Sequence, residues 1–145
     1  MRLVSAKSIN KGSCMSQVPL ISIVDDDDSL RNSLNNLIRS VGFGVQGFSS
    51  AEAFLNSNQL HDTSCLILDV RMPGMSGLEL QRQLAVTHSR IPIILITSHG
   101  DDGARGRALE AGAVEFLYKP FREEALLNAI HMALTSKADV RNDKA

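Results

Sequence analysis

The chain has 145 residues and a formal net charge of −1, with 43% hydrophobic and 21% charged residues. This composition is ordinary for a folded globular protein and excludes a disordered or fibrous chain, and the length suits one domain with tails. Because the chain carries no excess of positive charge, we expect no direct binding of nucleic acid and no capture by an anionic membrane.

The positions of the cysteines and the hydropathy of the sequence indicate the cellular compartment of the chain. Cys14 falls in a polar N-terminal stretch and Cys65 at the head of an apolar run, which predicts no disulfide framework. No segment approaches the roughly 18 consecutive apolar residues of a membrane span, and the N-terminus lacks the apolar core of a signal peptide. We therefore expect a cytoplasmic protein.

The limits of the domain follow from where periodic patterns begin and end. Residues 1–18 mix polar residues without periodicity and are predicted to form a flexible tail, with Met15 as an alternative start of translation. Residues 137–145 are polar and are predicted to form a second flexible tail. One domain is expected between them, over residues 19–136.

The first strand and helix surround an acidic run. Leu20–Val24 is a short apolar strand, and four consecutive acids, Asp25 to Asp28, follow it. Apolar residues at helical spacing predict a helix over residues 29–41, which Asp27 or Asp28 would cap and Gly42 would end. By itself, such an acidic run is typical of a solvated helix cap.

The second unit is weaker than the first. Gly44–Phe48 contains two glycines, which suits a strand at the edge of a sheet, where packing demands are lower. Ser49 and Glu52 have the spacing of a capping box, and they predict a short helix that frays from residue 56.

The third unit contains the most informative stretch. The apolar strand Ser64–Leu68 ends on Asp69, and turn residues follow at once. Continuous apolar residues of this length are typical of a strand buried in a parallel sheet. Taken alone, Asp69 fits a turn cap as well as it fits a functional site. Ser76 and Glu79 then form a second capping box, which begins the third helix.

The last two units complete the pattern. Ile91–Ile96 predicts another buried strand, which ends at Thr97. Residues 101–111 predict a mobile helix, because its two glycines, Gly103 and Gly106, each cost about 1 kcal/mol relative to Ala. Residues 113–118 predict the fifth strand, and a final helix is expected to end at Ser136.

Five strands that alternate with five helices predict an α/β fold with a parallel sheet and right-handed crossovers. We expect a flavodoxin-like (βα)5 three-layer sandwich with strand order 2-1-3-4-5. The turn after the first strand is acidic where a dinucleotide site would need glycines, so nucleotide binding is not expected there.

The strand ends deliver polar side chains to one edge of this sheet, namely Asp25, Asp26, Asp69, Thr97 and Lys119. In the order 2-1-3-4-5 the first and third strands are neighbours, so the three carboxylates converge on one pocket. Two carboxylates about 4 Å apart repel by roughly 4 kcal/mol at an effective dielectric constant of about 20. Three such groups need a cation, and an all-oxygen site suits Mg²⁺ or Mn²⁺.

These groups can promote transfer of a phosphoryl group to a carboxylate. A cation and the Lys119 ammonium would neutralise the transferred oxygens, and the product would be an acyl phosphate on Asp69. The Thr97 hydroxyl can donate to a phosphoryl oxygen and pull the following loop inward, which would act as a switch. Taken singly, Thr97 fits an ordinary strand residue and Lys119 fits a surface cation.

Four segments, in order and in spacing, resemble the response-regulator receiver domains of two-component signalling: Ile23–Asp27, Leu68–Gly77, Ile96–Asp101 and Lys119–Phe121. A fifth segment, Gly112–Leu117, is similar to the nitrogen-fixation regulator subfamily. The resemblance covers residues 20–136.

The resemblance implies roles for the acids. Asp69 would be the phosphoacceptor, Asp26 would bind Mg²⁺ directly, and Asp25 would act through a metal-bound water. The main-chain carbonyl of Arg71 would be a further metal ligand. The donor would be a sensor histidine kinase or a phosphotransfer protein, and the only catalysis would be self-phosphorylation and autodephosphorylation.

The resemblance also implies a switch. Thr97 and Lys119 would be the signalling pair, Phe116 would be the aromatic residue that turns inward, and the Lys119–Pro120 bond would be cis. The fourth helix, fifth strand and fifth helix would form a switching face, with Ala108 and Val114 exposed on it. That face would dock a partner or an output domain, or form a homodimer.

Some positions depart from the family pattern or vary within it. Arg71 and His99 occupy variable positions beside the pocket, and we expect them to modulate the lifetime of the acyl phosphate. Members of the subfamily usually carry a helix-turn-helix output domain after the receiver, and the residues after Ser136 are too few to form one.

Two other classes of function remain open. An aspartyl-phosphate hydrolase resembling haloacid dehalogenases also pairs an Asp nucleophile with Thr and Lys, but it needs a second Asp where this chain has Arg71, and a cap domain does not fit this length. A phosphate-independent interaction module is the other alternative. The sequence identifies neither the cognate kinase nor the output.

Overall fold

The computed structural model describes residues 18–87, 90–98 and 102–144, with the side chains of the last helix described to Thr135. The predicted N-terminal tail, apart from Val18, lies outside the described residues. Within them, five strands form one sheet in the order β3-β2-β4-β5-β6. Their bounds are β2 (Leu20–Val24), β3 (Gly44–Phe48), β4 (Thr63–Asp69), β5 (Ile93–Thr97) and β6 (Glu115–Tyr118).

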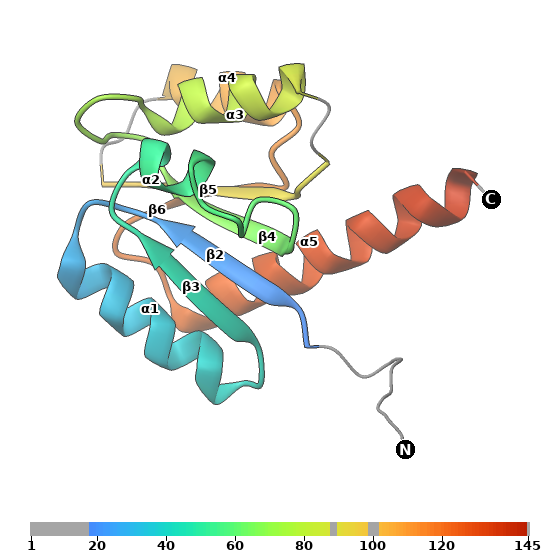
Figure 1. The fold of residues 1–145 in the computed structure, drawn as a ribbon, viewed down its shortest axis with the longest axis horizontal. Helices are drawn as coiled ribbons and strands as arrows, with labels where there is room; N and C mark the ends of the chain where they lie inside the picture. The colour runs from blue at the N-terminus through green and yellow to red at the C-terminus, as the bar shows by residue number, and fades with distance from the viewer. Residues whose placement is uncertain (1–17, 88–89, 99–101, 145) are drawn as a thin grey trace.

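Every pair of neighbouring strands is parallel. Counted along the chain, the strand order is 2-1-3-4-5, which confirms the predicted flavodoxin-like α/β fold (Figure 1). The glycine-containing strand β3 lies at the sheet edge, as its composition indicated. The strands β2, β4 and β5 are inner strands, and their nearly continuous apolar sequences are buried.

Two buried strands differ from their predicted bounds by one or two residues. Asp69 is the last residue of β4, because it pairs with Ile96 and the N–H of Val70 donates to the carbonyl of Ile96 at 2.9 Å. Strand β5 begins at Ile93, after Pro92, which has no N–H to contribute to a sheet. The phosphoacceptor candidate is therefore held by the sheet itself.

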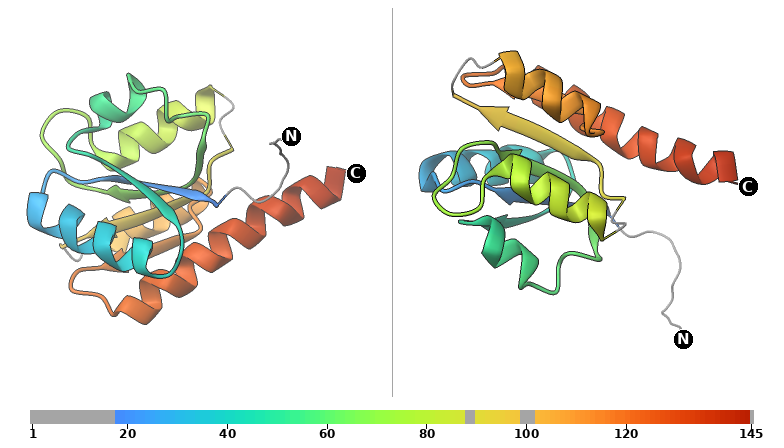
Figure 2. Two further views of the ribbon diagram at one scale, coloured as in Figure 1. Left: turned by 60° about the horizontal axis from the view of Figure 1, so that its bottom comes forward. Right: turned by 90° about the horizontal axis from the view of Figure 1, so that it is seen from above.

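Five helices cover the two faces of the sheet: α1 (Asp28–Ser40), α2 (Ala51–Leu55), α3 (Gly77–Val86), α4 (Asp102–Glu110) and α5 (Glu123–Lys144). Helices α1 and α5 lie on one face, and α2, α3 and α4 lie on the other (Figures 1 and 2). Each face has its own apolar cluster, one with the buried side chains of α1 and α5 and one with those of the other three helices. The fold is thus the predicted three-layer sandwich.

Several helix ends follow the predicted signals. The Asp27 carboxylate caps α1 by accepting from the N–H groups of Ser29 and Leu30, and Ser76 and Glu79 form the predicted capping box of α3. Gly42 adopts a φ of +101° just past the C-terminus of α1, a conformation that side chains other than glycine rarely adopt.

The predicted capping box of α2 is wrong. Ser50, not Ser49, is the N-cap, and its hydroxyl accepts from the N–H of Ala53 at 3.0 Å. Glu52 is therefore the second helical residue and not the third, so its side chain does not reach back to the cap. It contacts a different part of the chain, described below.

Helix α5 is longer than predicted. It continues past Ser136 to Lys144 and extends beyond the sheet (Figure 1). Residues 136–144 contain neither glycine nor proline, so nothing in the local sequence stops the helix. Among the described helices, none combines the length and the apolar character that a membrane crossing requires.

Candidate functional site

The candidate site lies at the carboxyl edge of the sheet, where β2, β4, β5 and β6 end. Asp25 follows the last residue of β2 and is fully buried, and Asp69 ends β4 with 5% of its surface exposed. Thr97 ends β5 and is also buried, and Lys119 follows β6. The predicted strand-end residues are therefore brought to one edge, as the strand order required.

The acidic run after β2 is held by local hydrogen bonds. One oxygen of the Asp25 carboxylate accepts from the N–H of Asp27 at 2.9 Å, which turns the chain into helix α1. The Arg31 guanidinium, one turn into that helix, donates to the main-chain carbonyl of Asp25 and pairs with the Asp28 carboxylate. The position of Asp25 thus depends on main-chain and side-chain contacts with the start of α1.

Lys119 joins the two buried acids. Its ammonium lies 3.0 Å from the second Asp25 oxygen and 3.7 Å from an Asp69 oxygen. The shorter distance to Asp25 means that the ammonium is centred on the neighbouring acid and not on the phosphoacceptor candidate. A single positive charge therefore balances two carboxylates that lie on adjacent strands.

The groups around Asp69 only partly compensate its negative charge. Burial raises the pKa of Asp69 to about 7, and the nearby Asp25 carboxylate adds to the increase. The Lys119 ammonium and the N–H of Arg71, which lies 3.3 Å from an Asp69 oxygen, lower the pKa but only in part. An additional positive charge at this position would be needed to keep Asp69 ionised well below neutral pH.

Three carboxylates form an all-oxygen cluster. Ligand atoms of Asp25, Asp26 and Asp69 all lie within 4.8 Å of one another. Asp26 is exposed, whereas the other two are buried, so the cluster is open toward solvent on one side. This donor set and the raised pKa of Asp69 fit a hard divalent cation such as Mg²⁺, which binds oxygen ligands and retains water.

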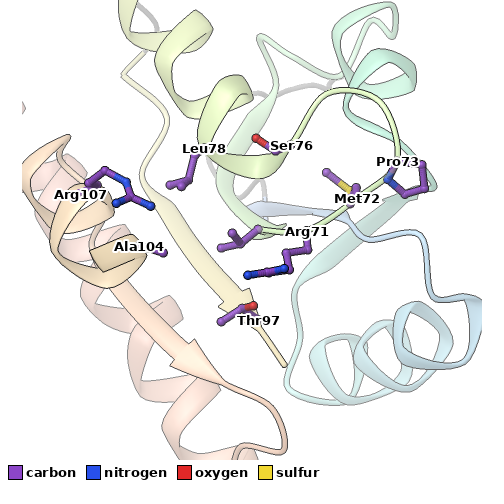
Figure 3. Close-up of a pocket in the computed structure, with 9 residues that line it drawn as sticks. Arg71, Met72, Pro73, Ser76, Leu78, Thr97, Ala104 and Arg107 are labelled. Carbon is purple, nitrogen blue, oxygen red and sulfur yellow. The ribbon is translucent and has the colours of Figure 1, made fainter. Parts of the chain in front are cut away.

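A pocket of about 520 Å³ lies beside the acids, between the β4–α3 loop and helix α4 (Figure 3). Arg71 reaches into it from the loop, Arg107 lies on the α4 side, and Thr97 lies at the end of β5 between them. Its remaining lining residues are Val70, Met72, Pro73, Ser76, Leu78 and Ala104. The buried Thr97 therefore borders this pocket at the end of β5.

The structure locates two of the predicted switch features, the cis peptide bond and Phe116. The Lys119–Pro120 peptide bond is cis. Phe116 has only 1% of its surface exposed and packs in the core beneath α2, α3 and α4, so in this conformation its side chain already points inward. His99 lies outside the described residues.

The predicted exposed face is also partly wrong. Ala108 is fully buried, because α4 packs this small side chain against the core, and Val114 is half-buried. The exposed surface of α4 is formed by other residues, among them Leu109 and Glu110.

Three residues near the site were not identified as site residues from the sequence. Arg31 supports the acidic turn, Arg107 lines the pocket, and Glu52 contacts the β4–α3 loop. The spacing of Arg31 after Asp28 is a usual ion-pair spacing on a helix and could have identified the first contact. The other two contacts join segments that no local pattern connects.

Comparison with known proteins agrees with this geometry. The family model described as "Response regulator receiver domain" matches residues 21–131. The response regulator protein TmoT of Ectopseudomonas mendocina is 53% identical over 118 residues, which cover 81% of this chain and 54% of TmoT. The transcriptional regulatory protein FixJ of Bradyrhizobium diazoefficiens is 42% identical over 114 residues, which cover 79% of this chain and 56% of FixJ.

A solved structure of the response regulator StyR aligns with a TM-score of 0.81 and 50% identity, covering 88% of this chain and 64% of that chain. The similarity to FixJ agrees with the predicted resemblance to the nitrogen-fixation subfamily. The chain spans about half the length of the curated relatives that it matches.

Proposed function

The chain belongs to the response regulator receiver domain family, and on this basis we propose that it accepts a phosphoryl group on Asp69 from a sensor histidine kinase or a phosphotransfer protein. The acceptor reaction is Mg²⁺-dependent, and the phosphorylated domain signals through the face formed by α4, β6 and α5. The observation that carries this proposal is the Asp25–Lys119–Asp69 arrangement, with the ammonium 3.0 Å and 3.7 Å from the two acids.

Asp69 is the nucleophile in this proposal. Its carboxylate ends a buried inner strand and has one oxygen directed at Lys119, so the position of the attacking group is set by the sheet. In transfer from a phosphohistidine, an Asp69 oxygen bonds to phosphorus as the phosphorus–nitrogen bond of the donor breaks. The product is an acyl phosphate on Asp69.

Asp25, Asp26, Asp69 and the main-chain carbonyl of Arg71 would hold Mg²⁺ or Mn²⁺. Their oxygen donors and the clustered carboxylates support this assignment. The bound cation supplies positive charge against the transferred oxygens. The chain contributes the fixed positions of the acids, through the Asp27 N–H and the Arg31 guanidinium on one side and the sheet on the other.

Lys119 and Thr97 would report the phosphoryl group to the rest of the domain. The N–H of Lys119 donates to the main-chain carbonyl of Thr97 at 2.7 Å, so the two residues already share a direct backbone link. A shift of either residue toward an added phosphoryl group would be passed to the start of α4 and to β6. Because Phe116 already lies inside, we assign it a role in packing the activated state and not an inward turn from solvent.

Intact-mass spectrometry with acetyl phosphate tests the proposal. The parent protein should gain one phosphoryl mass in the presence of Mg²⁺, and Asp69→Asn should gain none. Asp62→Ala, which removes an exposed acid at the opposite end of β4, is the control and should label like the parent. Labelling of the Asp69→Asn protein would refute the phosphoacceptor, and labelling unaffected by a chelator would refute the metal.

The same assay separates the other two classes of function. A hydrolase of the haloacid dehalogenase type would turn over substrate without accumulating modified protein, and an interaction module would not be labelled at all. The lifetime of the label then tests two predicted modulating residues, Arg71, whose exposed side chain lines the pocket, and His99, which lies outside the described residues. Arg71→Ala and His99→Ala should change the decay rate and leave labelling intact.

Amide exchange locates the proposed signalling face. Exchange with and without beryllofluoride, a mimic of the phosphoryl group, should differ between residues 102 and 118. Phosphorylation-dependent self-association would be read from the mass of the particle in solution under the same two conditions. Exchange differences confined to α1 and α2 would contradict this choice of face.

A further inference from the structure

We propose that Glu52 is a positioning residue, which holds the β4–α3 loop in the conformation that presents the Arg71 carbonyl to the cation. This inference rests on the proposed function, because it assigns a support to the same site. Glu52 lies on α2, outside the acidic cluster, and no motif in the sequence assigns it this role.

Backbone contacts hold together the two ends of the loop between Asp69 and Gly77. The N–H of Gly77 donates to the carbonyl of Val70 at 2.9 Å. A Cβ atom at Gly77 would lie 2.3 Å from the Asp69 carbonyl oxygen, so only glycine allows this approach. These contacts fix where the loop starts and ends but do not reach its middle.

The far side of the loop is held by Glu52. A Glu52 carboxylate oxygen accepts from the main-chain N–H of Met75 at 3.2 Å, across 23 residues of sequence. Gly74, just before Met75, has a φ of +78°, and a Cβ atom there would lie 3.1 Å from the same oxygen. The backbone at Gly74 and Met75 and the Glu52 carboxylate therefore fit closely against each other.

Helix α2 does not need this carboxylate for its own structure. The hydroxyl of Ser50 caps α2 through the N–H of Ala53, and the Glu52 side chain is exposed. Substitution of Glu52 should therefore leave the helix and the overall fold intact. What it removes is the hydrogen bond from α2 to the Met75 N–H, while the Met72 and Met75 side chains remain packed against the apolar cluster that includes α2.

Loss of the Glu52 contact would affect the metal site through the short backbone segment between Met75 and Arg71. Arg71 and Met75 are separated by three residues, and the N–H of Arg71 also donates to Asp69. With Met75 held by Glu52 and Val70 held by Gly77, the intervening chain has few conformations open to it, which lowers the entropy cost of presenting the Arg71 carbonyl. Without Glu52, the segment would have to be ordered when the cation binds, so the affinity for the cation would be lower.

Two substitutions distinguish the effect of the Glu52 charge from the effect of its hydrogen bond to the Met75 N–H. Glu52→Gln removes the negative charge but keeps a side-chain oxygen that can accept from the Met75 N–H, whereas Glu52→Ala removes both. Asp62→Ala is the control for loss of an exposed acid elsewhere on the surface. If Glu52 acts by attracting the cation, the Gln and Ala variants should be impaired equally.

The first measurement is amide exchange of the metal-free protein by NMR. In Glu52→Ala the Met75 amide should exchange about tenfold faster than in the parent, and in Glu52→Gln and Asp62→Ala its rate should stay within about twofold of the parent rate. An unchanged Met75 rate in Glu52→Ala would overturn the inference, because the contact would then not hold the loop.

The second measurement is Mg²⁺ titration of the same proteins. We expect the Kd of Glu52→Ala to rise about three- to tenfold, less than the 10- to 100-fold usual for groups bonded directly to a ligand, because Glu52 acts through intervening backbone. Equal Kd increases in the Ala and Gln variants would also overturn the inference. If the parent itself bound no Mg²⁺, the proposed function and the positioning role would both fail, while the exchange data would still report on the Glu52–Met75 contact.

Discussion

Helices α5 and α4, which lie on opposite faces of the sheet, are held in different ways. On the α1 and α5 face, large aliphatic side chains are buried, among them Ile38 of α1 and Leu126 and Ile130 of α5. On the opposite face, α2 and α3 also bury large side chains, such as Phe54 and Leu80, but the described part of α4 contributes only Ala104 and Ala108 to the core. Burial of an Ile or Leu side chain is worth about 1.5 to 3 kcal/mol, and the alanine methyl much less.

Directional hydrogen bonds supplement the packing of the α2, α3 and α4 face. Glu52 bonds to the N–H of Met75, and the buried amide of Gln81 on α3 donates to the Ala108 carbonyl of α4 at 3.1 Å. The Arg105 guanidinium of α4 donates to the carbonyl of Phe116 at 3.1 Å. Each such bond contributes about 1 kcal/mol, so α4 can rearrange at lower cost than α5. The same face borders the pocket beside Thr97.

The largest change in stability is expected for a substitution on the buried face of α5. Ile130→Ala should lower the free energy of unfolding by about 3 kcal/mol, because it leaves a cavity in a fully packed layer. Urea unfolding provides the measurement, and Met132→Ala, on the same helix and 49% exposed, should change stability by less than about 0.5 kcal/mol. A loss below 1 kcal/mol for Ile130→Ala would show that α5 is not held more firmly than α4.

The second prediction concerns the charge at the sheet edge. The folded-state pKa of Asp69 is raised to about 7, so the folded protein binds this proton more tightly than the unfolded chain does. Its stabilising effect is present at low pH and is lost as the pH rises from about 4 to about 7.

In metal-free solution at pH 8, Asp69→Asn should therefore be more stable than the parent by about 2 kcal/mol, and the two should converge near pH 4. Thermal unfolding across this pH range is the measurement. Addition of Mg²⁺ should stabilise the parent more than the variant. A stability difference that does not change with pH would contradict the assignment.

The third prediction tests the bond between α3 and α4. Gln81→Ala should cost about 1 kcal/mol, because the Ala108 carbonyl loses one of its two donors and keeps only the N–H of Ala113 at 3.0 Å. Amide exchange should increase in α4 and not in α5. Gln83→Ala, an exposed position on the same helix, is the matched control and should have no effect on either helix.

The smallest effect should come from stiffening α4. Gly106 has open space where a Cβ would lie, so Gly106→Ala should raise stability by up to about 1 kcal/mol and slow exchange in α4. The same substitution at Gly112, where φ is +104°, should be destabilising instead. If Gly106→Ala slowed exchange equally in α5, the faces would not respond independently.

Local sequence determined most of the framework. The apolar runs predicted the strands, and alternation with helices predicted the parallel order, which places Asp25, Asp69, Thr97 and Lys119 at one edge. These features depend on periodicity and on turn residues, which act over a few positions. The capping residues Asp27 and Ser76 were predictable for the same reason.

Only the tertiary structure decided contacts between distant segments. Lys119 lies nearer to Asp25, 94 residues away, than to Asp69, and Glu52 bonds to Met75 and does not complete a capping box. The full burial of Ala108 likewise depends on how closely α4 approaches the sheet. Such contacts are set by how helices and loops pack once the sheet has formed, and no pattern within a short stretch of sequence specifies that geometry.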